Sequence, residues 1–308
     1  MALQKSELFS RSAQGLFTVV KNPTSSIGNI WWVDSTHANA TDSLLHGTSP
    51  DSPCATIDYA VGLATASTGD IIYVNPFHAE TITSSITMDK IGLSIIGLGR
   101  GESMPIVTPN GAIDAVTMTA AGSSISRIRF GVPGTTAQTA DINIGAAYCS
   151  IIDTRHLVST GTEEKTDTIT LTADADDCEI RGVRIYQTAV TSLGSGIILE
   201  GALTNLKIDD VYMFCTGGFG YTKGALADEA TATGVVITNS VFMNDKADTV
   251  CVEMGNNCKG FMSHCGINGR HTTLASNMSI STGMAYHQTF TVEEGGLSGY
   301  VNPVVDAE

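Results

Sequence analysis

The chain has 308 residues, a formal net charge of −15 and 15% charged residues, against roughly 25% in a typical soluble domain. An apolar fraction of 42% supplies a core and excludes an intrinsically disordered chain. The acidic balance argues against a sequence-independent nucleic-acid binder, which needs a basic surface for phosphates. It also argues against adhesion to an anionic membrane. We therefore expect neither nucleic acid nor membrane among the partners.

The first fifty residues contain apolar residues but no basic segment followed by an apolar one, so they do not resemble a secretory signal peptide. They include a pair of aromatic residues of the kind that anchors interfaces. We interpret residues 1–50 as an anchoring arm. Its expected anchors are Phe9, Phe17, Trp31 and Trp32.

The next segment predicts a short helix that covers the N-terminal end of the fold. Apolar residues recur at helical spacing from Ile57 to Ala64. We expect Ser52 to cap the helix, which ends near Thr68. Residues 70–74 then read as the first strand of the body.

A short pattern, apolar-x-x-apolar-x-apolar, recurs through the middle of the chain at intervals of 24 to 32 residues. The copies begin at residues 93, 125, 152, 180, 208, 237 and 261. The connections lack the helical patterns of βαβ units, and the two-residue turns typical of hairpins are few. Rungs of two or three short strands predict an all-β fold, a parallel β-helix. In such a solenoid equivalent residues stack in columns, in which neighbours lie about 4.8 Å apart along the axis.

The predicted organisation has three parts: the arm at residues 1–50, the β-helix at 51–270, and a C-terminal tail or cap at 271–308. None of the seven cysteines falls in a C-x-x-C pair, so neither a zinc ribbon nor a redox motif is indicated. We expect the cysteines to be small core residues. We expect no metal ion and no cofactor.

Five of the eight arginines lie between residues 127 and 184, which concentrates a sparse positive charge on one face. Aligning the repeats predicts one outward column of Ser126, Asp153, Arg181, Asp209 and Thr238. It predicts a second of Arg129, His156, Arg184, Tyr212 and Val241.

The candidate ligand or partner face comprises Arg129, His156, Arg181, Arg184 and Tyr212. Arginines hold carboxylates, and a tyrosine stacks on a sugar ring. Two alternatives stay open: a ladder of opposite charges between rungs, and an interface with a neighbouring subunit.

The stretch PCATIDYAVGLATASTGDIIYVNPFHAETI, residues 53–82, resembles the opening segment of the pectin-lyase-like, right-handed parallel β-helix superfamily. That segment typically combines an "ATI..A" helix with "GD.I.V.PG.Y.E". Here Phe77 stands where glycine is usual, and His78 where tyrosine is frequent. The resemblance implies a right-handed solenoid, in a superfamily of lyases, hydrolases, phage tailspikes and non-catalytic virion proteins.

The catalytic sets of the superfamily's enzymes are incomplete. The Gly-His-Gly and Arg-Ile-Lys segments of polygalacturonase-like members are absent. If the chain is an enzyme, Asp153, Asp209 and Arg184 are the candidate catalytic residues. The two aspartates would lie two rungs apart, roughly 9–10 Å, at the upper edge for an inverting hydrolase. The acidic run from Asp174 to Glu179 reads as a solvated turn rather than a calcium site.

The lack of a signal-peptide pattern, the paired tryptophans of the arm and the incomplete catalytic sets favour a structural phage virion protein, a capsid decoration protein, over an enzyme. The resemblance implies that it is a homotrimer. It would be made in the host cytoplasm and bind the major capsid protein or another virion component through its arm. The alternative is a tailspike-like or free polysaccharide lyase or hydrolase, or a glycan-binding module, that uses the Arg/His/Tyr face.

Overall fold

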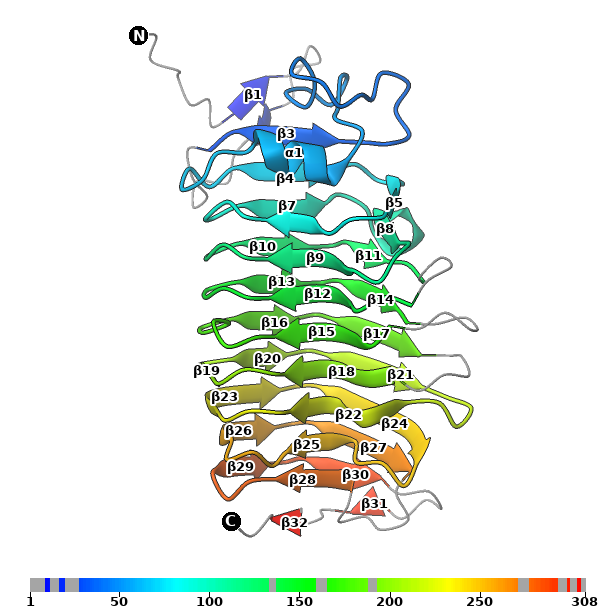
Figure 1. Ribbon diagram of the computed structural model, residues 1–308, viewed down its shortest axis with the longest axis vertical. Coiled ribbons are helices and arrows are strands. Elements are labelled where there is room, and N and C mark those ends of the chain that lie inside the picture. Colours follow the sequence, from blue (N-terminus) through cyan, green and yellow to red (C-terminus); the bar gives the residue numbers. More distant parts are fainter. Residues whose placement is uncertain are drawn as a thin grey trace.

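The chain coils into a parallel β-helix, as the repeat predicts (Figure 1). The computed structural model describes residues 9–11, 17–19, 28–132, 137–158, 165–187, 193–270, 277–292, 298–299 and 304–305, with side chains described between 28 and 289. From the N-terminal end downward, the chain passes behind from left to right and in front from right to left (Figure 1), which is a right-handed coil. The all-β fold class is therefore confirmed.

Three sheets run along the solenoid, and each full turn, or rung, adds one strand to each. Sheet 1 contains β3 (Ile30–Val33), β4 (Ile71–Val74), β7 (Ser94–Gly97), β10 (Ser124–Ser126), β13 (Ser150–Ile152), β16 (Glu179–Arg181), β20 (Lys207–Asp209), β23 (Ala232–Thr238), β26 (Lys259–Ser263) and β29 (Met284–His287), with β19 (Leu203–Thr204) paired to β23. Sheet 2 contains β5 (Ala79–Ile82), β8 (Ile106–Pro109), β11 (Arg129–Phe130), β14 (Arg155–Leu157), β17 (Arg184–Gln187), β21 (Tyr212–Cys215), β24 (Val241–Ala247), β27 (Gly266–Arg270), β30 (Phe290–Val292) and β31 (Ser298–Gly299). Sheet 3 contains β6 (Ile86–Met88), β9 (Asp114–Met118), β12 (Ala140–Ile144), β15 (Asp167–Leu171), β18 (Leu193–Leu199), β22 (Tyr221–Asp228), β25 (Val252–Met254), β28 (Met278–Ile280) and β32 (Val304–Val305). A separate antiparallel pair is formed by β1 (Phe9–Arg11) and β2 (Phe17–Val19).

The core consists of inward columns in which equivalent residues stack from rung to rung. In sheet 3, for example, Ile142 pairs with Ile169, and Ile169 with Ile197. All three are fully buried. The seven cysteines are also buried and free, so their prediction as core residues is confirmed.

Sheet 1 turns into sheet 2 at a corner that, on most rungs, contains a single residue with positive φ. Asp153 (φ 54°), Gly182 (φ 69°) and Asp210 (φ 51°) occupy this corner on successive rungs. Each donates its backbone N–H to a carbonyl of the next rung, as Asp153 does to Arg181 at 2.8 Å. Glycine, aspartate and asparagine tolerate this left-handed conformation best, which explains their recurrence at the corners.

The N-terminal cover is shorter than expected. Helix α1 spans Ile57–Leu63, and Thr56, not Ser52, caps it by accepting a hydrogen bond from the Tyr59 N–H at 3.3 Å. The helix packs against β3, β4 and β6, so its predicted position over the N-terminal end is correct. No helix in the described part of the chain is long and apolar enough to cross a membrane.

The arm prediction needs correction, because its C-terminal part belongs to the solenoid. Strand β3 precedes β4 in sheet 1 and pairs with it, so residues 70–74 are not the first strand. Trp31 donates its indole N–H to Asp70 at 3.2 Å, and the Trp32 ring packs 5.2 Å from Tyr73. Neither tryptophan is a free anchor. The side chains of Phe9 and Phe17 lie outside the described residues.

The predicted register is wrong on three rungs. Ile95, not Leu93, pairs with Ile125, and Met262, not Phe261, pairs with Ile237. Ile151, not Ile152, pairs with Ile180, and a one-residue slip exchanges the two faces of a strand. Consequently the column predicted to hold Asp153 holds Ile152 instead. The column predicted to hold His156 holds Arg155 instead, and His156 is fully buried.

Candidate functional site

The corrected register stacks three arginines on the outer face of sheet 2. Arg129, Arg155 and Arg184 follow one another on β11, β14 and β17, and Tyr212 continues the column on β21. Three of the predicted face residues therefore share a column, while Arg181 lies on sheet 1 next to Asp209. Arg155 is a face residue that the predicted columns did not contain. The recurring Ser-Ile pair at 124–125 and 150–151 was the signal that could have placed it.

A groove forms beside this column because two neighbouring corners differ in length. Seven residues, 98–104, separate Gly97 from Pro105, whereas the equivalent Arg127 and Ile128 on the next rung are adjacent. The longer corner includes the 3-10 turn η1 (Gly101–Ser103) and encloses a hollow together with the tighter corners of the next rungs. The resulting hollow is about 390 Å³ and is lined in part by Arg100, Met104, Arg127, Asp153, Arg155 and Arg184.

The arginines near the groove differ in whether a carboxylate already neutralises them. Arg129 pairs with Glu102, and Arg184 binds both carboxylate oxygens of Asp210 at 2.9 and 3.0 Å.

Arg100, Arg127 and Arg155, in contrast, have no carboxylate partner among the described residues. Asp153 is the only carboxylate in the lining, against four arginines. The groove is therefore a positive site on an acidic protein.

The predicted catalytic pair is not assembled. Asp209 accepts hydrogen bonds from the Thr238 hydroxyl at 2.6 Å and the Asn239 amide at 2.9 Å, and these two bonds lower its pKa. Arg181, expected between the two aspartates, lies 3.7 Å from Glu179 instead. Asp153 lies at the corner and lines the groove, which Asp209 does not. Within the described chain, no second carboxylate faces Asp153 across the groove.

His156 belongs to a buried polar network on the inner side of sheet 2. Its Nδ1 lies 2.9 Å from Asp141, and its Nε2 lies 2.9 Å from the Thr154 hydroxyl. Lys165 donates to both oxygens of Asp141 at 2.7 Å. The hydroxyl–imidazole–carboxylate order is that of a nucleophilic triad. However, all four side chains are fully buried, so no substrate reaches the hydroxyl from the groove.

The pKa values of Asp141 and His156 in the buried network are shifted from their ordinary values. Burial acts to raise the pKa of Asp141, but the Lys165 ammonium and His156 outweigh it and hold the pKa below its ordinary value. Burial lowers the pKa of His156 and so favours the neutral ring. These shifts belong to structure, not to catalysis.

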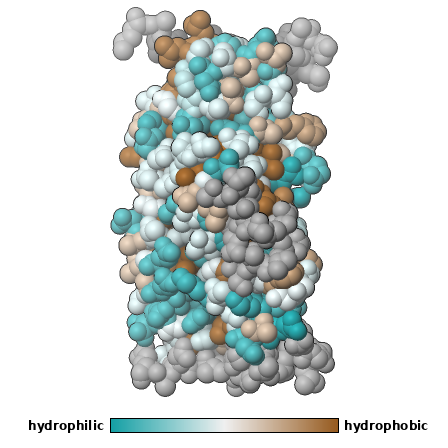
Figure 2. Space-filling view, turned by 45° about the vertical axis from the view of Figure 1, so that its right-hand side comes forward, coloured by the Kyte–Doolittle hydropathy of each residue, from teal (hydrophilic) through white to brown (hydrophobic). Residues whose placement is uncertain are grey.

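A second outward column of sheet 2 is apolar and runs beside the arginines. Leu157, Tyr186 and Phe214 follow one another on successive rungs, and the Tyr212 ring stacks on Phe214 with centroids 6.5 Å apart. On the side of the molecule turned toward sheet 2, hydrophobic residues stand as separate patches among hydrophilic ones (Figure 2). The two columns thus place guanidinium groups beside partly exposed apolar side chains on one surface.

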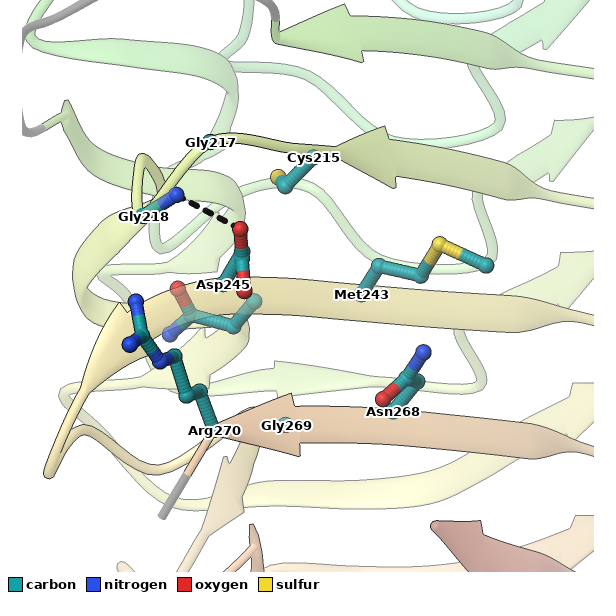
Figure 3. A pocket seen from close by; sticks show the side chains of 9 residues that line it. Cys215, Gly217, Gly218, Met243, Asp245, Asn268, Gly269 and Arg270 are labelled. Carbon is teal, nitrogen blue, oxygen red and sulfur yellow. Dashed lines mark hydrogen bonds between the residues drawn. The ribbon is translucent and has the colours of Figure 1, made fainter. Parts of the chain in front are cut away.

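A second hollow of about 400 Å³ lies nearer the C-terminal end of sheet 2, between β21, β24 and β27 (Figure 3). Asp245 points toward the glycine corner and accepts a hydrogen bond from the Gly218 N–H at 2.6 Å. Arg270 reaches into the same space (Figure 3). This hollow combines one arginine with one aspartate, so it lacks the excess positive charge of the groove.

The acidic run between Asp174 and Glu179 is bound to the next rung. Asp176 accepts hydrogen bonds from the Thr204 N–H at 2.6 Å and the Thr204 hydroxyl at 2.9 Å. Asp177 accepts one from Asn205 at 3.0 Å. No group of three or more histidine, cysteine or acidic residues in the described part of the chain is arranged to hold a metal ion.

Comparison with known proteins gives likenesses of fold. No protein-family model and no curated protein matches the chain. A solved rhamnogalacturonan lyase is 12% identical, with 84% of this chain and 82% of that one covered and a TM-score of 0.47. An alginate lyase from Paenibacillus sp. str. FPU-7 is 11% identical over 78% of this chain and 95% of that one, with a TM-score of 0.48. ORF18 of Geobacillus virus E2 is 10% identical over 86% of this chain and 61% of that one, with a TM-score of 0.42. At such low similarity, no activity transfers from these proteins to this chain.

Proposed function

We propose that the chain is a binding protein for an acidic polysaccharide, which lies in the arginine groove. The observation that carries this proposal is the presence of three guanidinium groups without a carboxylate partner in one hollow of a chain with a net charge of −15. Positive charge without a partner attracts an anionic ligand, while the net negative charge of the rest of the chain repels most other acidic proteins.

The geometry suits a polymer that presents carboxylates at regular intervals. Arg127 lies at the corner of one rung and Arg155 on β14 of the next, and the rungs are about 4.8 Å apart along the axis. Each planar guanidinium can hold a carboxylate with two parallel hydrogen bonds. The neighbouring column of Leu157, Tyr186 and Phe214 offers apolar surface for the faces of sugar rings. Double-stranded nucleic acid is disfavoured because it requires a much more extended basic surface.

We assign binding rather than hydrolysis to this groove. Hydrolysis of a glycosidic bond needs one protonated and one ionised carboxyl group on opposite sides of the bond. Asp153 has no such partner among the described groove residues, and the hydrogen bonds to Asp209 favour its ionised form.

The test measures affinity for acidic and neutral oligosaccharides of equal length by isothermal titration calorimetry. Arg155→Gln should weaken binding of the acidic chain about 10- to 100-fold, because a hydrogen bond to a charged group contributes roughly 1.5–3 kcal/mol. The matched control is Arg181→Gln, which removes an arginine outside the groove. Equal affinity for the two oligosaccharides, or equal losses in both variants, would contradict the proposal.

A second proposal concerns assembly: a structural virion component, homotrimeric and attached at its N-terminal end to the major capsid protein or another virion component. It is supported by two adjacent leucines, Leu44 and Leu45, which expose 84% and 86% of their surface in the segment between β3 and α1. Adjacent, almost fully exposed leucines are typical of contact sites.

Light scattering distinguishes one chain of 32.2 kDa from three. The double variant Leu44→Ser/Leu45→Ser should lose particle binding while it keeps the trimer and the affinity for acidic glycan. A monomeric wild type, or particle binding that survives the double substitution, would refute this second proposal.

A further inference from the structure

Two histidines lie side by side near the C-terminal end of the solenoid, away from the arginine groove. His264 follows β26 at the corner between sheets 1 and 2, with a φ of 54°. His287 ends β29 on the next rung. The backbone N–H of His264 donates to the His287 carbonyl at 3.1 Å. A main-chain hydrogen bond between rungs thus fixes the separation of the two residues.

The imidazole rings are close and face solvent. Their centroids lie 6.0 Å apart with an angle of 74° between the planes, and both side chains are exposed. An imidazole nitrogen binds Zn²⁺ at about 2.0–2.1 Å. Rings this close therefore leave one nitrogen of each within reach of a single ion.

A neighbouring hydroxyl orients one of the rings. The Ser263 hydroxyl hydrogen-bonds to Nδ1 of His264 at 2.7 Å. When Nδ1–H donates to that oxygen, the lone pair of Nε2 points outward and is free for a metal. Metal-binding histidines commonly use their second nitrogen in this way. The His287 ring has no hydrogen-bond partner among the described residues.

We propose that His264 and His287 together bind one divalent transition-metal ion such as Zn²⁺, with water in the remaining positions. Imidazole suits Zn²⁺, Cu²⁺ and Ni²⁺, whereas Mg²⁺ and Ca²⁺ prefer oxygen. Because no group of three potential ligands exists in the described chain, the site holds its metal weakly and exchanges it.

The bound ion would cross-link β26 and β29 through the two histidines. Solenoids open from their ends, since a terminal rung has a neighbour on only one side. A ligand that binds only the closed form shifts the opening equilibrium by a factor that grows with its concentration, about tenfold at ten times the dissociation constant. The pair therefore makes the stability of the C-terminal rungs responsive to metal.

The experiment combines equilibrium dialysis against ZnCl₂ with hydrogen exchange of peptides from β26 and β29. Wild type should bind one Zn²⁺ per chain, and exchange in these peptides should slow about tenfold and recover with EDTA. His264→Asn and His287→Asn should each abolish both effects. His37→Asn, which alters a histidine at the opposite end of the chain, should abolish neither.

Three results would overturn the proposal. They are no Zn²⁺-dependent slowing in wild type at millimolar metal, an unchanged response in either variant, and an equal response to MgCl₂. If hydrogen exchange is too fast to compare between wild type and variants, equilibrium dialysis still measures how much Zn²⁺ each protein binds. The groove plays no part in this test, and loss of glycan binding leaves it unaffected.

Discussion

Removing the positive partner of the buried ion pair should destabilise the protein strongly. Lys165→Met keeps the length of the side chain but leaves the Asp141 carboxylate without its ammonium in a fully buried site. Breaking one partner of a buried pair costs about 3–5 kcal/mol, because the remaining charge stays desolvated. That loss is a large part of the roughly 5–15 kcal/mol by which folded domains are stable.

A double variant separates the lost interaction from lost packing. Asp141→Asn removes the charge while its amide oxygen still accepts from the His156 ring. Asp141→Asn/Lys165→Met should therefore be more stable than Lys165→Met alone, since no unpaired charge remains. The coupling between the two substitutions is read from the double-mutant cycle.

Urea denaturation followed by far-ultraviolet circular dichroism reports on all rungs, whereas fluorescence of Trp31 and Trp32 reports on the N-terminal rung. The matched control is Lys207→Met, which removes an exposed lysine 2.9 Å from Glu179 and should leave the midpoint unchanged within error. A loss below about 1 kcal/mol for Lys165→Met, or a double variant no more stable than that single, would refute the reasoning.

Two further predictions concern ionisation and backbone conformation. Burial raises the pKa of Asp167 to about 6, so its ionisation reduces stability as pH rises from about 4 to 6. Asp167→Asn should therefore stabilise the protein at pH 7 by up to about 3 kcal/mol, and much less at pH 4, in urea titrations at both pH values. No pH dependence of the difference would contradict the assignment. Gly182→Ala should destabilise by about 1 kcal/mol or more, because φ is 69° and the new methyl would meet the Asp153 carboxylate. Gly62→Ala, in the helix with open space around it, should stabilise by roughly 0.5–1 kcal/mol. Thermal melts that rank the two alanine variants in the opposite order would refute this pair.

The fold was predictable because its signal is repeated. Each rung contributes an independent copy of the inward pattern, so a few misread copies do not change the fold. The register of three rungs was not predictable from apolar spacing alone. On one of them, for example, Ile151 and Ile152 satisfy the pattern equally well. Because of that ambiguity, His156 was predicted to face outward, and Arg155 was not predicted to do so.

The groove could be anticipated only in part. The concentration of arginines between 127 and 184 was visible in the sequence, but Arg100 lies outside that stretch. Its contribution depends on the seven-residue lengthening of one corner, which no periodic pattern describes. Trp31 was misassigned for a related reason, because β3 is separated from β4 by the helix and a long connection and so lacks the regular interval of the repeat.

The tight corners have a consequence for any ligand that spans several rungs. Their main-chain hydrogen bonds hold successive arginines at the pitch of the solenoid, about 4.8 Å, whatever the side chains do. The backbone thus sets the spacing of the charges in the column. If the charges of a polymer recur at another interval, one carboxylate can contact an arginine but the next carboxylate does not reach the next arginine. Selectivity for repeat length would then come from the scaffold and would survive substitution of any single arginine, even where affinity falls.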